Sequence, residues 1–201
     1  MIRESVDEFL HRLASGSPVP GGGSAAALAG AASAGLVSMV CGVTTRHSSG
    51  SDGLAEVERE ANELRARLVA LMADDARAFE ALLQARRTAR DKQSPVVREA
   101  LRGATGPPLD VARAAHRILE LCAHIAASAR PSTMADLGVA AALAGAALDG
   151  ATLTVRVNLS GLEDPGFTAA TASILDRLTA EASASRRRVA EVIGSRTGVP
   201  L

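Results

Sequence analysis

The sequence predicts an all-α protein, an up-and-down-like helical bundle with two central helices rich in small residues. Three observations predict this fold class. Apolar residues recur at steps of three and four over long stretches, which is the spacing of one helix face. Two long segments carry no charge and consist mostly of Ala, Gly and Ser, and no alternating segments are joined by hairpin turn signals. Because 201 residues is an ordinary length for one domain, we expect a single domain over residues 1–201.

The first predicted helix is short and amphipathic and covers residues 6–13. Ser5 and Glu8 have the spacing of a capping box at its start. The segment SGSPVPGGG follows and ends this helix, because prolines disfavour helical backbone in the residue before them and glycines weaken any regular element.

Residues 24–45 form the first predicted helix of small residues. Its small side chains recur every four positions, at Ala26, Gly30, Ala34, Ser38 and Gly42. Such a ridge lets a neighbouring backbone approach closely, as in the centre of a bundle. The length alone would also suit a transmembrane helix. We exclude this alternative and any membrane partner, because Ala, Gly and Ser insert weakly and no basic cluster flanks the segment. The stretch 137–148 is predicted to be the second such helix.

A long charged helix is predicted between them, over residues 54–88. Its apolar seam alternates steps of three and four, at Leu54, Val57, Ala61, Leu64, Leu68, Leu71, Asp75, Ala78 and Leu82. Asp75 stands where an apolar residue belongs. A carboxylate on a buried seam costs on the order of several kcal/mol unless it is paired, hydrogen-bonded or protonated. The sequence therefore singles out Asp75 as a residue with a special role.

The second half of the chain is also predicted to be helical. Ser94-Pro95 is typical of a helix start, and we expect the next helix to be interrupted at Gly106-Pro107-Pro108 and followed by a helix over 109–127. Residues 129–133 are predicted to form a turn and cap before the second small-residue helix. We expect a break at Asn158 and 161–166, and a final amphipathic helix over 169–193.

The composition excludes several classes of function. The 22 basic and 22 acidic residues balance, and only three Phe are aromatic, so neither charge nor base stacking favours a nucleic acid partner. The four histidines lack metal-ligand spacing, and we expect no metal. The N-terminus does not resemble a secretory signal, and the two cysteines have the character of reduced, buried thiols. We therefore expect a cytoplasmic protein.

The glycine run in PVPGGGS has three possible interpretations. A phosphate-binding loop is excluded, because no lysine follows the glycines and no strand precedes them. A flexible linker is one remaining interpretation. The other is a ligand site, because the first turn of a helix offers free backbone N–H groups to a carbonyl or carboxylate.

The segment SPVPGGGSAAALAGAASAGLVSMV closely resembles the opening motif of the formiminotransferase-cyclodeaminase C-terminal family. The similarity continues at DDARAF, where Asp75 fits the family's Asp-x-x-Ala-Phe element, and at Arg98 followed by a helix with the Pro108-Leu109 pair. In ADLGVAAALAGAALDGATLTVRVNL, Asp136 and Asn158 match the family's Ser-Asp and Asn-Leu elements. The resemblance covers most of the chain between Val6 and Phe167.

The resemblance implies a helical homodimer that binds folate in a cleft beside the glycine motif and needs no cofactor or metal. The two family reactions both pass through a tetrahedral carbon that bears nitrogen, so both need a group that moves protons. Our hypothesis is that Asp75 is this group and that Asp136 assists it. We expect substrate contacts from Pro20, Gly21, Gly22, Gly23, Ser24, Arg98 and Asn158.

Alternatives remain for the residues and for the reaction. Asp75 can instead be a structural carboxylate that caps another helix or pairs with Arg98, and Asp136 an ordinary helix-start acid. Arginines 86, 87, 90 and 186–188 are interpreted as solvated helix faces, with contact to a polyglutamate tail as the alternative.

Three functions are compatible with the resemblance. The first is a formimidoyltetrahydrofolate cyclodeaminase, which forms 5,10-methenyltetrahydrofolate and ammonia, and the second is a methenyltetrahydrofolate cyclohydrolase, which forms 10-formyltetrahydrofolate. Of these two we favour the cyclodeaminase, because the fused members of the family carry that activity. The third is a non-catalytic helical dimer, because Ala129-Arg130, Ala135 and Thr154 depart from the family pattern.

Overall fold

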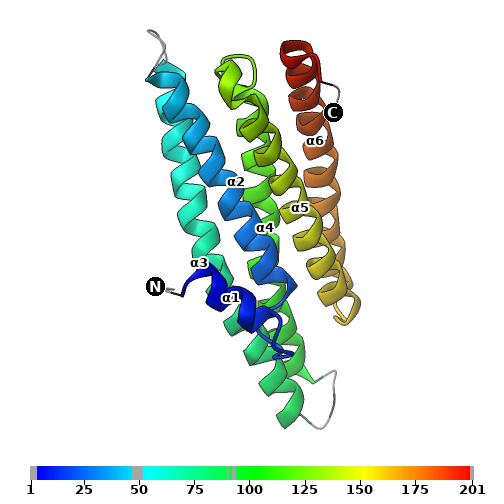
Figure 1. Cartoon of the computed structure of the whole chain (residues 1–201). Coiled ribbons are helices and arrows are strands. Elements are labelled where there is room, and N and C mark those ends of the chain that lie inside the picture. Colours follow the sequence, from blue (N-terminus) through cyan, green and yellow to red (C-terminus); the bar gives the residue numbers. More distant parts are fainter. Residues whose placement is uncertain (1–3, 47–51, 90, 92–93, 200–201) are drawn as a thin grey trace.

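The computed structural model describes residues 4–46, 52–89, 91 and 94–199. Its long helices lie side by side and are joined by short connections (Figure 1). They are α2 (Gly22–Thr45), α3 (Asp52–Thr88), α4 (Pro95–Ile125), α5 (Met134–Ser160) and α6 (Pro165–Thr197), with a 3-10 turn at Pro131–Thr133. Over the described ranges there is no strand. The predicted all-α class is confirmed.

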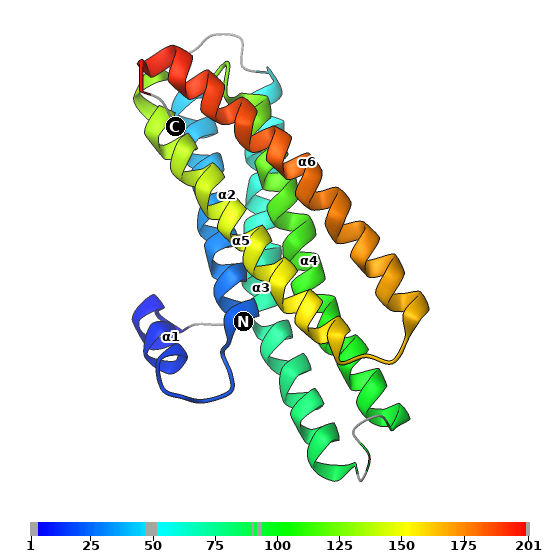
Figure 2. The same cartoon turned by 90° about the vertical axis from the view of Figure 1, so that its right-hand side faces the viewer.

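Helices α2 to α5 form the centre of the bundle. α2 packs against α3, α5 and α4, and α6 covers α4 and α5. The short helix α1 (Val6–Leu13) lies outside the bundle, beside α2 and α3 (Figures 1 and 2). It begins with the predicted capping box, in which the Ser5 hydroxyl accepts from the Glu8 N–H and the Glu8 carboxylate accepts from the Ser5 N–H.

The small residues of α2 permit the close packing that the sequence predicts. A Cβ on Gly30 would lie 3.2 Å from a Leu68 methyl group and 3.5 Å from the Ala147 Cβ. Further along α2, the buried Ser33 hydroxyl donates to the Ala140 carbonyl of α5 at 2.6 Å. The ridge therefore brings α2 close to α3 and α5 along its length.

We expect Gly30→Val to lower the free energy of unfolding by about 1–3 kcal/mol, because the added methyl groups overpack this contact. Gly103→Val is the matched control, since a Cβ at Gly103 meets no atom within 4 Å and both glycines lie inside helices. Urea unfolding of the two variants measures the difference. An equal loss in both would show that helix propensity, rather than packing, makes glycine necessary at position 30.

α2 and α5 also have the length and hydropathy of membrane-spanning helices. By composition alone, Gly22–Thr45 and Pro131–Ser160 both satisfy this criterion. About half of the most apolar window of each is buried within the bundle, and buried core helices have the same composition.

The predicted interruption at Gly106-Pro107-Pro108 is wrong, because α4 continues through both prolines. Pro108 has no N–H to donate to the carbonyl of Ala104, four residues earlier. The side-chain amide of Asn158 donates to that carbonyl instead, at 2.9 Å. Asn158 lies within α5 rather than in the predicted break. A residue from another helix thus satisfies the acceptor that Pro108 leaves free.

Asn158→Ala is expected to reduce the free energy of unfolding by about 1–3 kcal/mol, since it leaves a buried carbonyl without a donor. The loss should be smaller in a Pro108→Ala background, where the restored N–H reaches Ala104. A double-mutant cycle by urea unfolding measures the coupling. Equal losses in the two backgrounds would contradict this account of the α4 proline pair.

Candidate active site

Asp75 meets the beginning of α2. The antiparallel packing of α3 on α2 brings its carboxylate to the first turn of α2, where the Ser24 hydroxyl donates to Oδ2 at 2.9 Å. The Ser24 backbone N–H also donates to the carboxylate. Gly21, the N-cap residue of α2, has no side chain to supply a cap. Asp75 therefore caps α2 from a neighbouring helix, which is the helix-capping alternative stated in the sequence analysis, and the free N–H groups there favour negative charge.

Gly23 makes this contact possible. A Cβ at Gly23 would lie 2.2 Å from Oδ1 and 2.6 Å from the carboxyl carbon of Asp75. No side chain fits there while the carboxylate keeps its place. The sequence assigned Gly23 to a ligand contact, and the structure shows a packing reason for glycine at this position. Gly22, by contrast, is exposed, and its Cβ position has no atom within 4 Å.

The Asp75 side chain is half-buried. Burial raises the pKa of its carboxyl above the ordinary value, and the hydrogen bonds from Ser24 oppose part of that increase. No ion pair of Asp75 occurs among the described residues, so the alternative pairing with Arg98 is not seen. A carboxyl with a raised pKa and hydrogen-bonding neighbours suits the acceptance and return of a proton.

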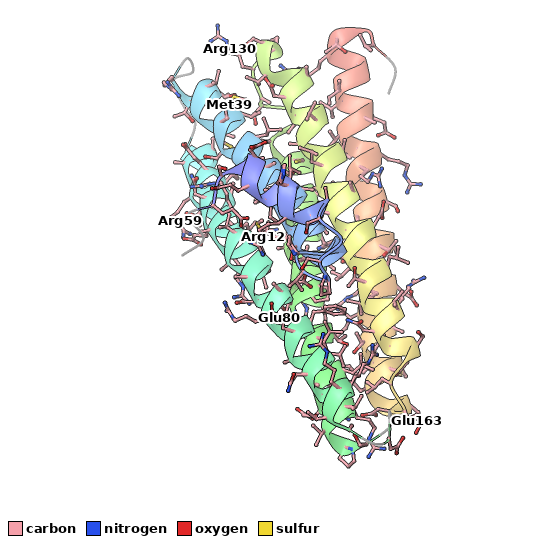
Figure 3. The ribbon with its side chains drawn as sticks, turned by 60° about the horizontal axis from the view of Figure 1, so that its bottom comes forward. Arg12, Met39, Arg59, Glu80, Arg130 and Glu163 are labelled. Carbon is pink, nitrogen blue, oxygen red and sulfur yellow. The ribbon has the colours of Figure 1, made fainter. Side chains whose placement is uncertain are left out.

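Cavities lie beside the motif that leads into α2. Pro20 lines a pocket of about 210 Å³ between α1 and α3, together with Phe9, Met72 and Ala76. Arg12 of α1 also lines this pocket, and Figure 3 shows it where α1 crosses the bundle. A wider groove of about 690 Å³ runs along α3 next to the Ser17–Val19 loop. The proline-glycine segment therefore borders open space on the α3 side.

Asp136 does not join Asp75 within one chain. It is half-buried in the first turn of α5, one turn before Ala140, which pairs with Ser33 in the middle of α2. Ser24 and Asp75 lie at the beginning of α2. At 1.5 Å per helical residue, Asp136 is about 20 Å from them along the bundle.

Arg98 lies near the start of α4 in a separate pocket of about 450 Å³, which Pro95, Arg102 and Asp164 also line. Arg102 in that pocket pairs with Asp164, and its guanidinium lies 5.3 Å from the centre of the Phe167 ring. Glu163, also in this pocket, is labelled in Figure 3 at the α5–α6 connection.

Arg86 is a residue that the sequence analysis interpreted as part of a solvated helix face, with contact to a polyglutamate tail as the alternative. A Cβ on Gly161 would lie 4.0 Å from an Arg86 guanidinium nitrogen, so this arginine reaches from α3 to the end of α5. Nothing in the sequence near Arg86 indicates this, because the two residues lie on helices that are far apart in the sequence and meet only in the folded bundle. Arg90 of the same cluster lies outside the described residues, as does His47.

Metal-binding groups do not gather in the described part of the chain: no three His, Cys, Asp or Glu side chains there are placed to share an ion. The buried His116 instead lies 3.2 Å from the Glu181 carboxylate of α6. Cys41 and Cys122 are both buried free thiols.

The model of the family described as formiminotransferase-cyclodeaminase matches residues 5–177. This chain belongs to that family. The match confirms the resemblance inferred from the glycine motif and Asp75. Together with the relatives described below, it shows that the chain is a folate one-carbon enzyme of the cyclodeaminase and cyclohydrolase type.

Three proteins that are similar to this chain are informative. A methenyltetrahydrofolate cyclohydrolase of Methylorubrum extorquens is 36% identical over 96% of this chain and 97% of its own. The formimidoyltransferase-cyclodeaminase of Mus musculus is 31% identical over 97% of this chain, which spans only 37% of the mouse protein. The crystal structure of formiminotetrahydrofolate cyclodeaminase from Thermotoga maritima has a TM-score of 0.90 at 25% identity, with 96% of this chain and 97% of that one covered.

Proposed function

We propose that this chain is a methenyltetrahydrofolate cyclohydrolase, which converts 5,10-methenyltetrahydrofolate and water to 10-formyltetrahydrofolate. The similarity to the Methylorubrum extorquens cyclohydrolase supports this choice, because it extends over nearly the whole of both chains. Because of this similarity we now prefer the cyclohydrolase to the cyclodeaminase, which the sequence analysis favoured.

The position of Asp75 carries the proposal. In the reaction, water attacks the cationic carbon between N5 and N10 and a C–O bond forms. The C–N5 bond then breaks as the C–O bond becomes the C=O bond of the formyl group, and the second proton of the water is released to solvent. The Asp75 carboxylate takes a proton from the attacking water and returns a proton to the departing N5. Its half-buried place disfavours the charged form, and the hydrogen bonds from Ser24 oppose part of that effect.

The N–H groups at the start of α2 supply the second element of the proposed site. Gly21 and Gly22 carry no side chain and lie in the first turn of an α-helix whose N-cap makes no side-chain hydrogen bond. We propose that these N–H groups bind a carbonyl of the folate, with Pro20 shaping the approach. Arg98 and Asn158 are proposed as more distant contacts, and Asp136 as an assisting acid from elsewhere in the assembly.

The cyclodeaminase is the second candidate, supported by the high structural similarity to the Thermotoga maritima enzyme. Ultraviolet absorbance of 5,10-methenyltetrahydrofolate distinguishes the candidates in one assay. Loss of absorbance in water beyond the uncatalysed rate supports the cyclohydrolase, and a gain from 5-formiminotetrahydrofolate supports the cyclodeaminase. A protein with no effect on either substrate would be the non-catalytic dimer. That alternative was based on the departures from the family pattern at Ala129-Arg130, Ala135 and Thr154.

We also propose that the protein is a homodimer in the cytoplasm, formed through the outer face of α2 and α5. α2 has no charged residue from Gly22 to Thr45, and the two helices lie side by side (Figure 1). Large apolar side chains are exposed on these two helices, namely Met39 on α2 and Val139, Leu153 and Val157 on α5. Figure 3 shows Met39 on α2, toward the end of the bundle that carries Arg130.

The assembly can be tested by light scattering of the Leu153→Glu variant. Leu153 is 65% exposed on α5, and Val96 is 64% exposed at the start of α4, so Val96→Glu is the matched control. Leu153→Glu should give monomers and Val96→Glu should not. A dimer that survives Leu153→Glu would exclude this face.

A further inference from the structure

We infer that Ser24 is a positioning residue whose hydroxyl alternates between Asp75 and the Met72 carbonyl, so that Asp75 stays hydrogen-bonded in both of its protonation states. This inference rests on the proposed function, because it concerns the acid assigned to proton transfer. The sequence analysis assigned the Ser24 hydroxyl to the substrate. The structure places it between two acceptors of the protein instead.

The Ser24 hydroxyl has two acceptors and one proton. Its Oγ lies 2.9 Å from Asp75 Oδ2 and 3.1 Å from the Met72 carbonyl oxygen. Ser24 is only 1% exposed, so bulk water has little access to it. A hydroxyl donates one hydrogen bond and accepts others. It can therefore donate to only one of these oxygens at a time.

Each protonation state of Asp75 matches one orientation of the hydroxyl. When Asp75 is ionised, the hydroxyl donates to Oδ2 and stabilises the negative charge. When Oδ2 carries a proton, the Oδ2–H donates to the Ser24 Oγ, and the hydroxyl proton turns to Met72. No bond to carbon changes in this step, and the proton that Asp75 gains or loses is exchanged with the reacting water or N5.

The exchange requires only that O–H groups reorient. Met72 and Asp75 lie one turn apart on α3, so the helix fixes the two acceptors relative to each other. Gly23 admits the carboxylate to the start of α2 because it has no Cβ. The Ser24 O–H rotates about its C–O bond and the carboxyl O–H turns between Ser24 and the substrate, while the heavy atoms keep their places. A site prepared in this way needs little reorganisation during proton transfer.

Charged neighbours do not account for the arrangement. α2 carries no charged residue, and on α3 the adjacent Asp74 pairs with Arg77. At this end of α4, Arg102 pairs with Asp164, and Arg98 makes no ion pair with Asp75 among the described residues. The causes that shift the Asp75 pKa are burial and the two Ser24 hydrogen bonds. Ser24 is thus the neighbouring residue whose replacement should change the pKa of Asp75.

The test is the titration of the Asp75 carboxyl carbon by NMR, combined with the pH profile of kcat/KM, in Ser24→Ala and Ser24→Thr. Ser24→Ala removes a hydrogen bond that favours the charged form, so the pKa of Asp75 should rise. The acid limb of kcat/KM should move to higher pH with it, because the ionised form accepts the proton, and kcat should fall about tenfold. Ser24→Thr keeps the hydroxyl and should restore both values toward wild type.

Ser33→Ala is the matched control. Ser33 is also buried on α2 and donates its hydroxyl to a backbone carbonyl, that of Ala140, but it lies away from Asp75. This control should leave the Asp75 titration and the pH profile unchanged. If Ser24→Ala fails to fold, Ser24→Cys keeps the size of the side chain with a weaker donor and should raise the Asp75 pKa in the same direction.

An Asp75 titration that is the same in wild type, Ser24→Ala and Ser24→Cys would overturn the inference. An equal shift in Ser33→Ala would also overturn it, because the effect would then be structural. The NMR titration needs no substrate. If the wild-type protein acts on neither folate, the proposed function fails, while the titration still decides whether Ser24 controls Asp75.

Discussion

Asp75→Asn should lower kcat for the folate substrate by about 10²- to 10⁴-fold, the range expected for loss of a general acid-base group. The amide has the shape of the carboxyl group and can still accept from Ser24, whose Oγ lies 2.9 Å from Oδ2. It cannot take up and return a proton. The fold should therefore persist while turnover is lost, and the absorbance assay with circular dichroism measures both.

Asp74→Asn is the matched control for this variant. Asp74 precedes Asp75 on α3 and pairs with Arg77 at the surface, so its replacement should leave turnover nearly unchanged. Similar losses in the two variants would contradict the catalytic assignment of Asp75. Full activity of Asp75→Asn with both folate substrates would refute it.

The Asp75 variant also tests the effect of burial on stability. Because burial raises the pKa of Asp75 in the folded protein, the folded state binds this proton more tightly than the unfolded state. The stability gained from the proton is therefore present at low pH and is lost as the pH rises from the ordinary Asp value of about 3.9 through the folded pKa. Relative to Asp75→Asn, the wild type should become less stable over this interval in urea unfolding measured at several pH values.

Gly23→Ala should reduce kcat at least about 10²-fold, because it displaces the group on which proton transfer depends. The new Cβ would lie 2.2 Å from Oδ1 of Asp75, so the carboxylate must leave the start of α2. The free energy of unfolding should change less, because the lost hydrogen bonds from Ser24 cost about 1–3 kcal/mol while Ala improves helix propensity by about 1 kcal/mol.

Gly22→Ala provides the comparison for Gly23→Ala. A Cβ at Gly22 meets no atom within 4 Å, so the Asp75 contact should persist and the fall in kcat should be much smaller. In an Asp75→Ala background, Gly23→Ala should become stabilising, because the clash is gone and the gain in propensity remains. Equal losses of kcat in Gly22→Ala and Gly23→Ala would contradict the specific role of Gly23 in admitting Asp75.

The sequence was sufficient to predict the helices whose patterns are local. The capping box of α1, the seam of α3 and the small-residue ridge of α2 each depend on residues a few positions apart, and the structure contains all three. The error at Pro107-Pro108 has a non-local cause. Asn158, 54 residues further along the sequence, satisfies the Ala104 carbonyl, and no local rule could indicate it.

The candidate site could be predicted only in part for the same reason. Asp75 stood out because it interrupts an apolar seam, which a single segment reveals. Its contact with Gly23 depends on the register of α3 against α2, and the approach of Arg86 to Gly161 depends on where α3 lies relative to the end of α5. The sequence grouped Asp136 with Asp75 by family resemblance, yet the antiparallel packing of α5 on α2 places it far along the bundle.

Because Asp75 caps α2, hydrogen exchange at one backbone amide reports whether the Asp75 carboxylate is in its place in the site. The Ser24 backbone N–H donates to this carboxylate, so hydrogen exchange at that amide requires the first turn of α2 to separate from α3. Its protection factor would therefore report the fraction of molecules in which the acid is in place. Fraying of this single helical turn would inactivate the protein while the rest of the bundle stayed folded.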